Sequence, residues 1–249
     1  MKSNPSVEPP RPGVKRVAIL QSSYIPWKGY FDIINLVDEF ILYDDRQYTK
    51  RDWRNRNVIK TANGLQWLSI PVQVKGKYHQ RIDETLVADD SWSEHHWKRI
   101  EQTYGRAAHF RAFRDAVAAA YAGPGESRLS LINRRFLEVI AGLLGVRTRF
   151  SWSTDYDGAG DRTDRLVSLC RAAGAREYLS GPSGRAYIDQ AQFDEAGVGL
   201  IYMDYSGYPE YAQLHGQQFV HEVSILDLLF NTGADAPRYM KSFTSVVRT

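Results

Sequence analysis

The chain has little cysteine and no long apolar run. Cys170 is the only cysteine among 249 residues, which excludes an intramolecular disulfide framework and a cysteine-rich zinc site. No apolar run approaches the roughly 20 residues that a membrane-spanning helix needs, and the first 16 residues contain no apolar segment of the kind found in secretory signals. We therefore expect a cytoplasmic protein that does not cross a membrane.

Outside its first 16 residues the chain also lacks an excess of positive charge. The formal net charge is +3, from 32 basic and 29 acidic residues. Residues 1–16 hold four of the basic residues and one acidic residue, which leaves 28 of each sign in the remainder. A nucleic-acid groove normally gives its domain a basic excess. We therefore expect no nucleic-acid partner, and a disordered, Pro-rich tail over residues 1–16.

Short apolar runs alternate with helical patterns along the rest of the chain. The runs predict strands at residues 17–20, 39–43, 147–151, 177–180 and 198–203. The dipeptide Asn63-Gly64 predicts a β-hairpin that pairs residues 57–61 with 66–74. We therefore predict an α/β fold with a mainly parallel, Rossmann-like sheet, a hairpin and a helical insertion. The expected parts of this single compact unit are a tail at 1–16, a first α/β half at 17–91, the insertion at 92–145 and a second α/β half at 146–249.

Polar side chains follow the first predicted strand. Ligands of open α/β sheets bind beyond the carboxyl ends of the strands, and the start of the next helix offers free N–H groups to an anion. A plain connecting loop is the alternative. The substrate-binding candidates in this loop and helix start are Gln21, Tyr24, Lys28, Gly29 and Tyr30.

A second polar cluster follows the next predicted strand. Asp44 and Asp45 end this strand and could act as general bases, as metal ligands, or as hydrogen-bond acceptors for a substrate. The alternatives are two solvated turn residues, or ion pairs with Arg54, Arg56 or Lys60. The stretch 54–57 supplies guanidinium and amide donors that suit a carboxylate, phosphate or sugar. Asn57 is a candidate catalytic residue, and Asn55 and Arg56 are candidates for substrate binding.

The second half of the chain repeats this arrangement. A loop rich in small residues follows the predicted strand at 177–180 and contributes Ser180, Gly181 and Ser183, with Tyr187 close behind. We expect these residues to share one cleft with the first two strand ends. Further substrate-binding candidates are Trp67 in the hairpin, and Thr163 and Asp164 at a helix start.

Histidines at two places in the sequence and the single cysteine also need an interpretation. His109 in the helical insertion is a candidate catalytic residue, with a structural role as the alternative. Cys170 shares a helix face with Leu166 and Val167, which predicts a buried thiol instead of a reactive one. His95-His96 is interpreted as helix surface, so we predict no metal site.

Four stretches, in this order, resemble the WbqC-like protein family and span nearly all of residues 17–233. The family occurs in gene clusters for surface-polysaccharide and natural-product biosynthesis. The resemblance therefore implies a biosynthetic enzyme, an acyl- or aminoacyltransferase that moves an acyl group from a thioester to an amine of an amino sugar or amino acid. The matching stretches are QSSYIPWKGYFD, DEFILYDDRQYTKRDWRNRNVIKTANGLQWLSIPV, TDRLVSLCRAAGAREYLSG and YAQLHGQQFVHEVSILDLLFN.

The resemblance also bears on partners. It implies a small-molecule substrate and no resident cofactor, with the acyl donor carried as the phosphopantetheine thioester of an acyl or peptidyl carrier protein. Two other functions stay open. The segment 26–30 is similar to the triphosphate-gripping loop of nucleotidylyltransferases, although their His-x-Gly-His motif is missing, and the many tyrosines suit a non-enzymatic sugar- or peptide-binding module. The sequence carries no signal of oligomeric state.

Overall fold

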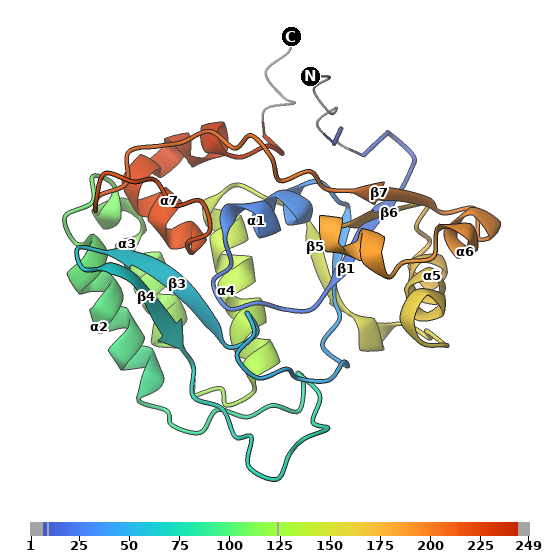
Figure 1. The fold of residues 1–249 in the computed structure, drawn as a ribbon, viewed down its shortest axis with the longest axis horizontal. Helices are drawn as coiled ribbons and strands as arrows, with labels where there is room; N and C mark the ends of the chain where they lie inside the picture. The colour runs from blue at the N-terminus through green and yellow to red at the C-terminus, as the bar shows by residue number, and fades with distance from the viewer. Residues whose placement is uncertain (1–6, 9, 124, 244–249) are drawn as a thin grey trace.

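The computed structural model describes residues 7–8, 10–123 and 125–243. Its main sheet has five parallel strands in the order β5-β2-β1-β6-β7 (Figure 1). Counted along the chain within this sheet, the order is 3-2-1-4-5, which is a Rossmann-type order. The predicted α/β class with a mainly parallel, Rossmann-like sheet is confirmed. The strands are β1 Arg16–Leu20, β2 Glu39–Leu42, β5 Arg149–Trp152, β6 Glu177–Ser180 and β7 Gly199–Tyr202.

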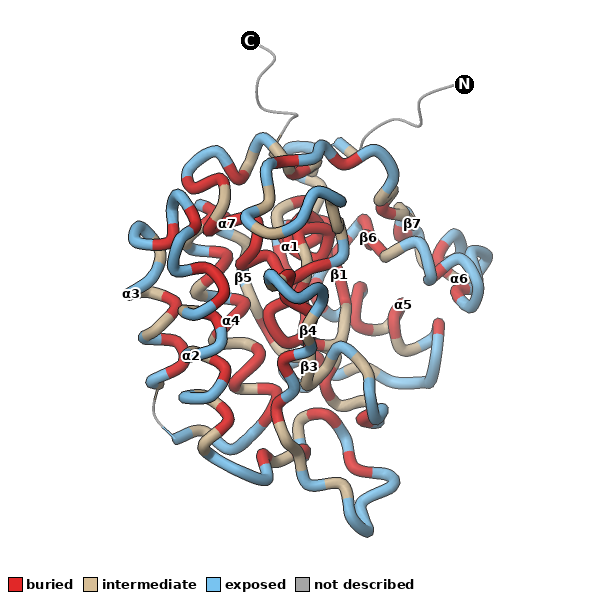
Figure 2. The backbone as a smooth tube through the Cα atoms, turned by 60° about the vertical axis from the view of Figure 1, so that its left-hand side comes forward, coloured by how far each residue is buried: buried red, intermediate tan, exposed pale blue. Residues whose placement is uncertain are grey.

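Both faces of the sheet are covered by helices, as a parallel sheet requires. Successive side chains of a strand point to opposite faces, and in β1 Val17 and Ile19 belong to one buried cluster whereas Ala18 belongs to the other. The first cluster includes α5 Arg162–Ala172 and α6 Gln190–Glu195. The second includes α1 Lys28–Asn35, α4 Leu129–Leu143 and α7 Ile225–Thr232. Figure 2 shows the central strands among the most buried parts of the chain.

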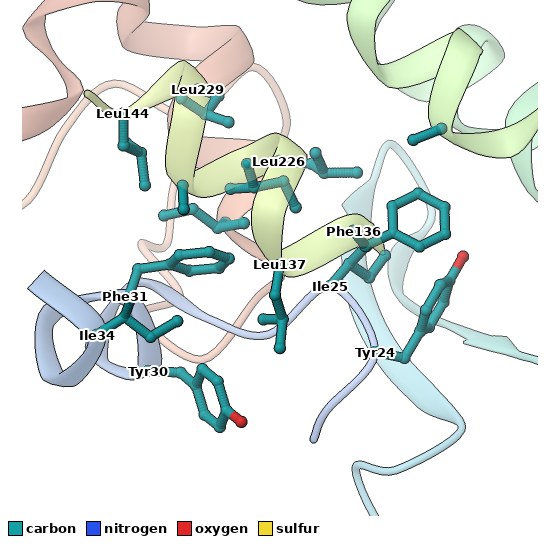
Figure 3. Close-up of a cluster of buried hydrophobic side chains, with 14 of the residues drawn as sticks. Tyr24, Ile25, Tyr30, Phe31, Ile34, Phe136, Leu137, Leu144, Leu226 and Leu229 are labelled. Atoms are coloured by element: carbon teal, nitrogen blue, oxygen red, sulfur yellow. The ribbon is translucent and has the colours of Figure 1, made fainter. Parts of the chain in front are cut away.

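The three helices expected in residues 92–145 are α2 Trp92–Tyr104, α3 Phe110–Tyr121 and α4. They share the larger core with the sheet. In Figure 3, Leu137 of α4 lies near Tyr30 and Phe31 of α1, and Phe136 lies beside Tyr24. None of the helices in the described ranges has the length and apolar content to cross a bilayer. The described residues also form the 3-10 helices η1 Ser153–Asp155, η2 Pro182–Ala186 and η3 Gly233–Tyr239.

The predicted hairpin forms from β3 Arg56–Thr61 and β4 Gly64–Ser69, with Gly64 at a φ of 100° in the turn. Its second strand ends at Ser69, whereas residues 66–74 were expected to be extended and paired. Ile70 instead donates its N–H to the carbonyl of Asn55 at 2.7 Å, and Pro71 has no N–H for a ladder. Figure 1 shows the hairpin between α2 and the parallel sheet.

The tail expected over residues 1–16 ends earlier than predicted. Residues 1–6 and 9 lie outside the described residues, but Arg16 already belongs to β1 and donates to Glu177 at 2.8 Å. Lys15 forms an ion pair with Glu39 at 2.7 Å. Both carboxylates are buried, and a buried charge needs a partner, so these two basic residues are held in place.

Candidate functional site

The main candidate site lies where the strand order reverses. Within the sheet, β2 pairs with one edge of β1, and β6 pairs with the opposite edge. Ligands of doubly wound sheets bind at such a point, outside the carboxyl ends of the strands. A cavity of about 1130 Å³ opens there, which we call the switch-point cavity. Its lining includes Leu20 at the end of β1, Gln21 directly after it, Tyr43 after β2, Arg162 of α5 and Ser183 after β6.

The structure brings together five of the residues that the sequence nominated. Gln21, Tyr30, Asn57, Ser183 and Tyr187 all line the switch-point cavity. They come from both halves of the chain, so the expected convergence of the strand-end loops is present. The other nominated residues lie elsewhere: Tyr24, Lys28, Gly29, Asp44, Asp45, Asn55, Arg56, Trp67, His109, Thr163, Asp164, Ser180 and Gly181 do not line it.

The charge of the cavity wall is predominantly positive. Arg46, Arg54 and Arg162 line it, and Glu222 is the one carboxylate among the described residues that do so. Arg162 is exposed and makes no hydrogen bond or ion pair with the described residues. Sequence reasoning did not select Arg46, Arg162 or Glu222. Arg46 could have been found from the sequence, because it lies four residues after β2 ends at Leu42 and ligands bind beyond the carboxyl ends of such strands.

Hydrogen bonds fix the loop that follows β1. Arg54 donates from Nη1 to the carbonyls of Gln21 at 2.8 Å and Ser22 at 2.9 Å. The hydroxyl of Tyr30 also donates to the Gln21 carbonyl, at 2.8 Å. Asn133 of α4 donates to Ser22 Oγ at 2.9 Å. These bonds use the main chain of Gln21 and leave its side-chain amide unpaired among the described residues.

Asp44 supports this loop from behind and does not face the cavity. Its Oδ1 accepts the N–H of Ser22 at 2.7 Å, while Oδ2 has no hydrogen-bond partner in the described part of the chain. Burial raises the pKa of Asp44 to about 6, although the Ser22 hydrogen bonds and the charge of Arg54 oppose this shift. Asp44 also lines a separate hollow of about 200 Å³ with Ser130. Its position does not suit a general base for a ligand in the switch-point cavity.

Asp45 is the centre of an ion-pair cluster. It accepts hydrogen bonds from Ser153 Oγ at 2.8 Å, from Arg165 at 2.9 Å and from Arg46 at 3.2 Å. Burial would raise its pKa, but these donors and positive charges outweigh burial and lower it. Asp45 therefore positions Arg46, whose guanidinium also lies 4.6 Å from the ring centre of Tyr43. Asp45 is therefore ion-paired, but with Arg165 and Arg46 and not with Arg54, Arg56 or Lys60, the partners considered from the sequence.

Asn57 lines the cavity but its side-chain donors are occupied. Nδ2 donates to the carbonyls of Tyr24 and Ile25, each at 3.0 Å, and Oδ1 accepts the N–H of Val58 at 2.7 Å. Ile25 has a φ of 37°, a backbone conformation that costs energy for a β-branched residue. Asn57 holds this strained turn, so it has no free N–H for an oxyanion.

Two nominated residues of the first loop are buried in the core. The hydroxyl of Tyr24 contacts His96 Nδ1 at 2.9 Å and the Tyr121 hydroxyl at 2.5 Å. Lys28 donates to the carbonyl of Pro209 at 3.1 Å and lies 4.8 Å from the ring centre of Tyr208. Burial lowers the pKa of Lys28 to about 8. Neither side chain is available to a ligand in the cavity.

Gly29 and His109 both make packing contacts, Gly29 with the indole of Trp27 and His109 with Gly233. A Cβ on Gly29 would overlap the indole of Trp27, which lines the cavity, so this glycine allows Trp27 to pack against α1. His109 is exposed at the start of α3, and its ring lies against Gly233. His109 therefore lies between α3 and η3 and does not line the cavity.

The remaining candidate residues do not line the cavity. Asn55 binds the Tyr48 hydroxyl at 2.9 Å and the Ile70 carbonyl at 2.8 Å. Thr163 Oγ1 accepts the N–H of Asp189 at 3.1 Å. Ser180 is buried at the end of β6. Asp164 lies in another surface hollow, Gly181 caps η2, and the Arg56 guanidinium lies 4.1 Å from a Trp67 ring centre.

Three expectations about reactive groups can be compared with the structure. Cys170 is fully buried, as predicted, and burial raises its pKa to about 12. A thiol with that pKa stays protonated at neutral pH and is a poor nucleophile. His95 is exposed as expected, whereas His96 is buried, so its interpretation as helix surface was wrong. Among the described residues, no three His, Cys, Asp or Glu side chains gather closely enough to hold a metal ion.

Comparison with known proteins places the chain in a family. The family model described as the WbqC-like protein family matches residues 21–239, a range that contains the cavity wall from Gln21 to Glu222. A curated relative, the Uncharacterized protein Rv1507c of Mycobacterium tuberculosis (strain ATCC 25618 / H37Rv), is 54% identical over 228 residues, which covers 92% of this chain and 98% of the relative. No solved structure matches the chain. The chain belongs to the WbqC-like protein family.

Proposed function

We propose that this protein is a group-transfer enzyme that binds an anionic substrate in the switch-point cavity. Within that class we propose an acyl- or aminoacyltransferase that moves an acyl group from a thioester to an amine. The observation that supports this proposal best is the charge of the cavity wall. Among the described residues, the wall contains three arginines, Arg46, Arg54 and Arg162, and a single carboxylate, Glu222. A volume of about 1130 Å³ also leaves room for two reactants, since small-ligand sites commonly measure about 300–1,000 Å³.

The three arginines differ in their availability. Arg54 donates hydrogen bonds to main-chain carbonyls and Arg46 donates one to Asp45. These two arginines therefore contribute mainly a fixed positive potential in the cavity. Arg162 has no partner among the described residues and is free to pair with a ligand. A guanidinium binds phosphate in a bidentate manner. The phosphodiester of a phosphopantetheine arm or the diphosphate of a nucleotide sugar fits this requirement.

The unpaired groups of the cavity suit acyl transfer to an amine. The amine nitrogen attacks the thioester carbonyl carbon, the carbonyl oxygen becomes an oxyanion, and the thiolate leaves as the amide forms. Glu222 is placed to accept the proton that the amine loses. The Gln21 amide and the hydroxyls of Ser23 and Ser183 line the same cavity and are candidate donors to the oxyanion. Such a direct transfer needs no covalent enzyme intermediate.

A transfer assay tests this proposal. The full chain is incubated with acetyl-coenzyme A or an acyl carrier protein thioester, together with a panel of amino sugars and amino acids. We expect thiol release that depends on the amine, with a matching amide detected by mass spectrometry. Arg162→Ala should raise KM for the phosphate-bearing donor, whereas Arg171→Ala, on the same helix but outside the cavity, should not.

A second panel distinguishes the main alternative. The same chain is incubated with nucleoside triphosphates and sugar phosphates, and pyrophosphate release is followed. Pyrophosphate release without any amide product would contradict acyl transfer and favour nucleotidyl transfer in the same arginine-lined cavity. Tight binding of substrates with no turnover in either panel would favour a binding module.

A further inference from the structure

Two tryptophans stand exposed next to each other at the rim of the switch-point cavity. Trp53 is 43% exposed and Trp67 is 46% exposed. Their ring centres are 5.4 Å apart and their planes are inclined by 35°. Exposed apolar patches on a folded protein commonly mark binding surfaces. We call this pair the tryptophan platform.

Both rings are attached to well-anchored backbone. Trp67 lies on β4 in register with Val58 of β3, and the Arg56 guanidinium is positioned over its ring at 4.1 Å from the centre. The Trp53 carbonyl accepts the N–H of Tyr24 at 3.0 Å. A surface that is already ordered loses little conformational entropy when a ligand binds. The platform therefore has the rigidity of a binding site.

The platform is continuous with the cavity. Trp53 lines the cavity, whereas Trp67 does not. The pair therefore leads from the cavity mouth outward along the hairpin. A ligand with one end among the arginines and a longer body would pass over Trp53 and reach Trp67.

We propose that the tryptophan platform binds a pyranose ring of the acceptor substrate. The face of an indole ring is electron-rich, so it attracts the C–H groups on the flat side of a sugar ring. The hydroxyls at the edge of that sugar need polar partners, which the Arg56 guanidinium over one face of Trp67 and the exposed Ser69, two residues further along β4, can supply. The pair forms an open surface with inclined planes. A nucleobase is better held between parallel faces.

This inference deepens the proposed function, because it assigns the acceptor to the class of saccharides. The two proposals nevertheless rest on different residues. The anion depends on Arg162 inside the cavity, and the sugar depends on Trp67 outside it. Each can fail while the other stands.

Binding of neutral oligosaccharides tests the platform directly. Cellotetraose and chitotetraose are titrated into the full chain, with calorimetry and saturation-transfer NMR as readouts and uridine and adenosine as nucleobase probes. We expect a tetrasaccharide to bind the wild-type chain and Trp67→Ala to weaken its affinity by roughly tenfold. Trp67→Tyr keeps a ring and should retain most of the affinity. Leu65→Ala removes another exposed apolar side chain from the same face of β4 and should change nothing.

Several results of these titrations would contradict the inference. No tetrasaccharide binding to the wild-type chain, or equal binding by Trp67→Ala, would overturn the inference. Nucleosides that bind through Trp67 while tetrasaccharides do not would assign the platform to a base. Pyrophosphate binding serves as the folding control, since Trp67→Ala should preserve it and Arg162→Ala should weaken it without affecting tetrasaccharides.

Discussion

The carboxylate of Asp44 accepts the main-chain N–H of Ser22 at 2.7 Å, across the carboxyl ends of neighbouring strands β1 and β2. This bond holds the loop that forms one wall of the switch-point cavity. Because the cavity-facing residues Gln21 and Arg54 are tied to the same loop, Asp44 shapes the site from behind. Its buried position has a consequence for stability that depends on pH.

The first prediction concerns this pH dependence. Burial raises the pKa of Asp44 from 3.8 to about 6, so between these values the folded state binds more protons than the unfolded state. The contribution of Asp44 to stability is therefore greatest below about pH 4 and is lost as the pH rises through about 6. Asp44→Asn resembles the protonated side chain, so its stability relative to wild type should increase between pH 4 and 7, by on the order of 3 kcal/mol at most. Denaturant unfolding at several pH values measures this difference, and a constant difference would contradict it.

The second prediction concerns Asp45. If Asp45 acted only as a general base, as the sequence indicated, Asp45→Asn would hardly change the melting temperature. The ion pairs with Arg165 and Arg46 change that expectation. Asp45→Asn should lower the free energy of unfolding by about 2 kcal/mol at pH 7. Because the pKa of Asp45 is lowered, this loss should shrink in acid, opposite in trend to Asp44→Asn, and calorimetric melting at pH 7 and pH 3 would reveal it.

The third prediction concerns Glu222. If this carboxylate accepts the proton of the amine, Glu222→Gln should lower kcat by about a hundredfold or more with little change in melting temperature, since the side chain is exposed. Glu195→Gln on α6, also exposed and outside the cavity, is the matched control. Equal turnover of the two variants would remove Glu222 from the mechanism.

The fourth prediction concerns Cys170. Its buried, protonated thiol should react with iodoacetamide only after the protein is unfolded, and Cys170→Ser should keep kcat within a few-fold of wild type. Labelling followed by mass spectrometry and a turnover assay measure both. A loss of more than about a hundredfold, which corresponds to roughly 2.7 kcal/mol of barrier, in a folded variant would show that the thiol takes part in the reaction.

The sequence was sufficient to locate the strands and the region of the cavity. Short apolar runs indicated the strands of the sheet, and the rule that ligands bind beyond strand ends pointed to Gln21 and Ser183. It was not sufficient to say which way each side chain points. Tyr43 lines the switch-point cavity whereas the next residue, Asp44, lines the hollow behind it, because successive side chains in an extended segment face opposite sides.

Other parts of the site depend on contacts between distant segments. Glu222 reaches the cavity from the irregular segment between β7 and α7, where no periodic pattern shows its direction. Asn57 has the chemistry of an oxyanion donor, but its amide is consumed by carbonyls more than 30 positions away. Such pairings arise only when the chain is folded, so a pattern of residue types cannot supply them.

Calorimetric titration of pyrophosphate into the wild-type chain, Arg162→Ala and Arg171→Ala tests the central claim most directly. The claim is that the switch-point cavity binds an anion through Arg162. We predict that pyrophosphate binds the wild-type chain and that Arg162→Ala weakens this binding by roughly tenfold or more, with Arg171→Ala unchanged. Equal affinities for wild type and Arg162→Ala, or no binding by the wild-type chain, would contradict the account.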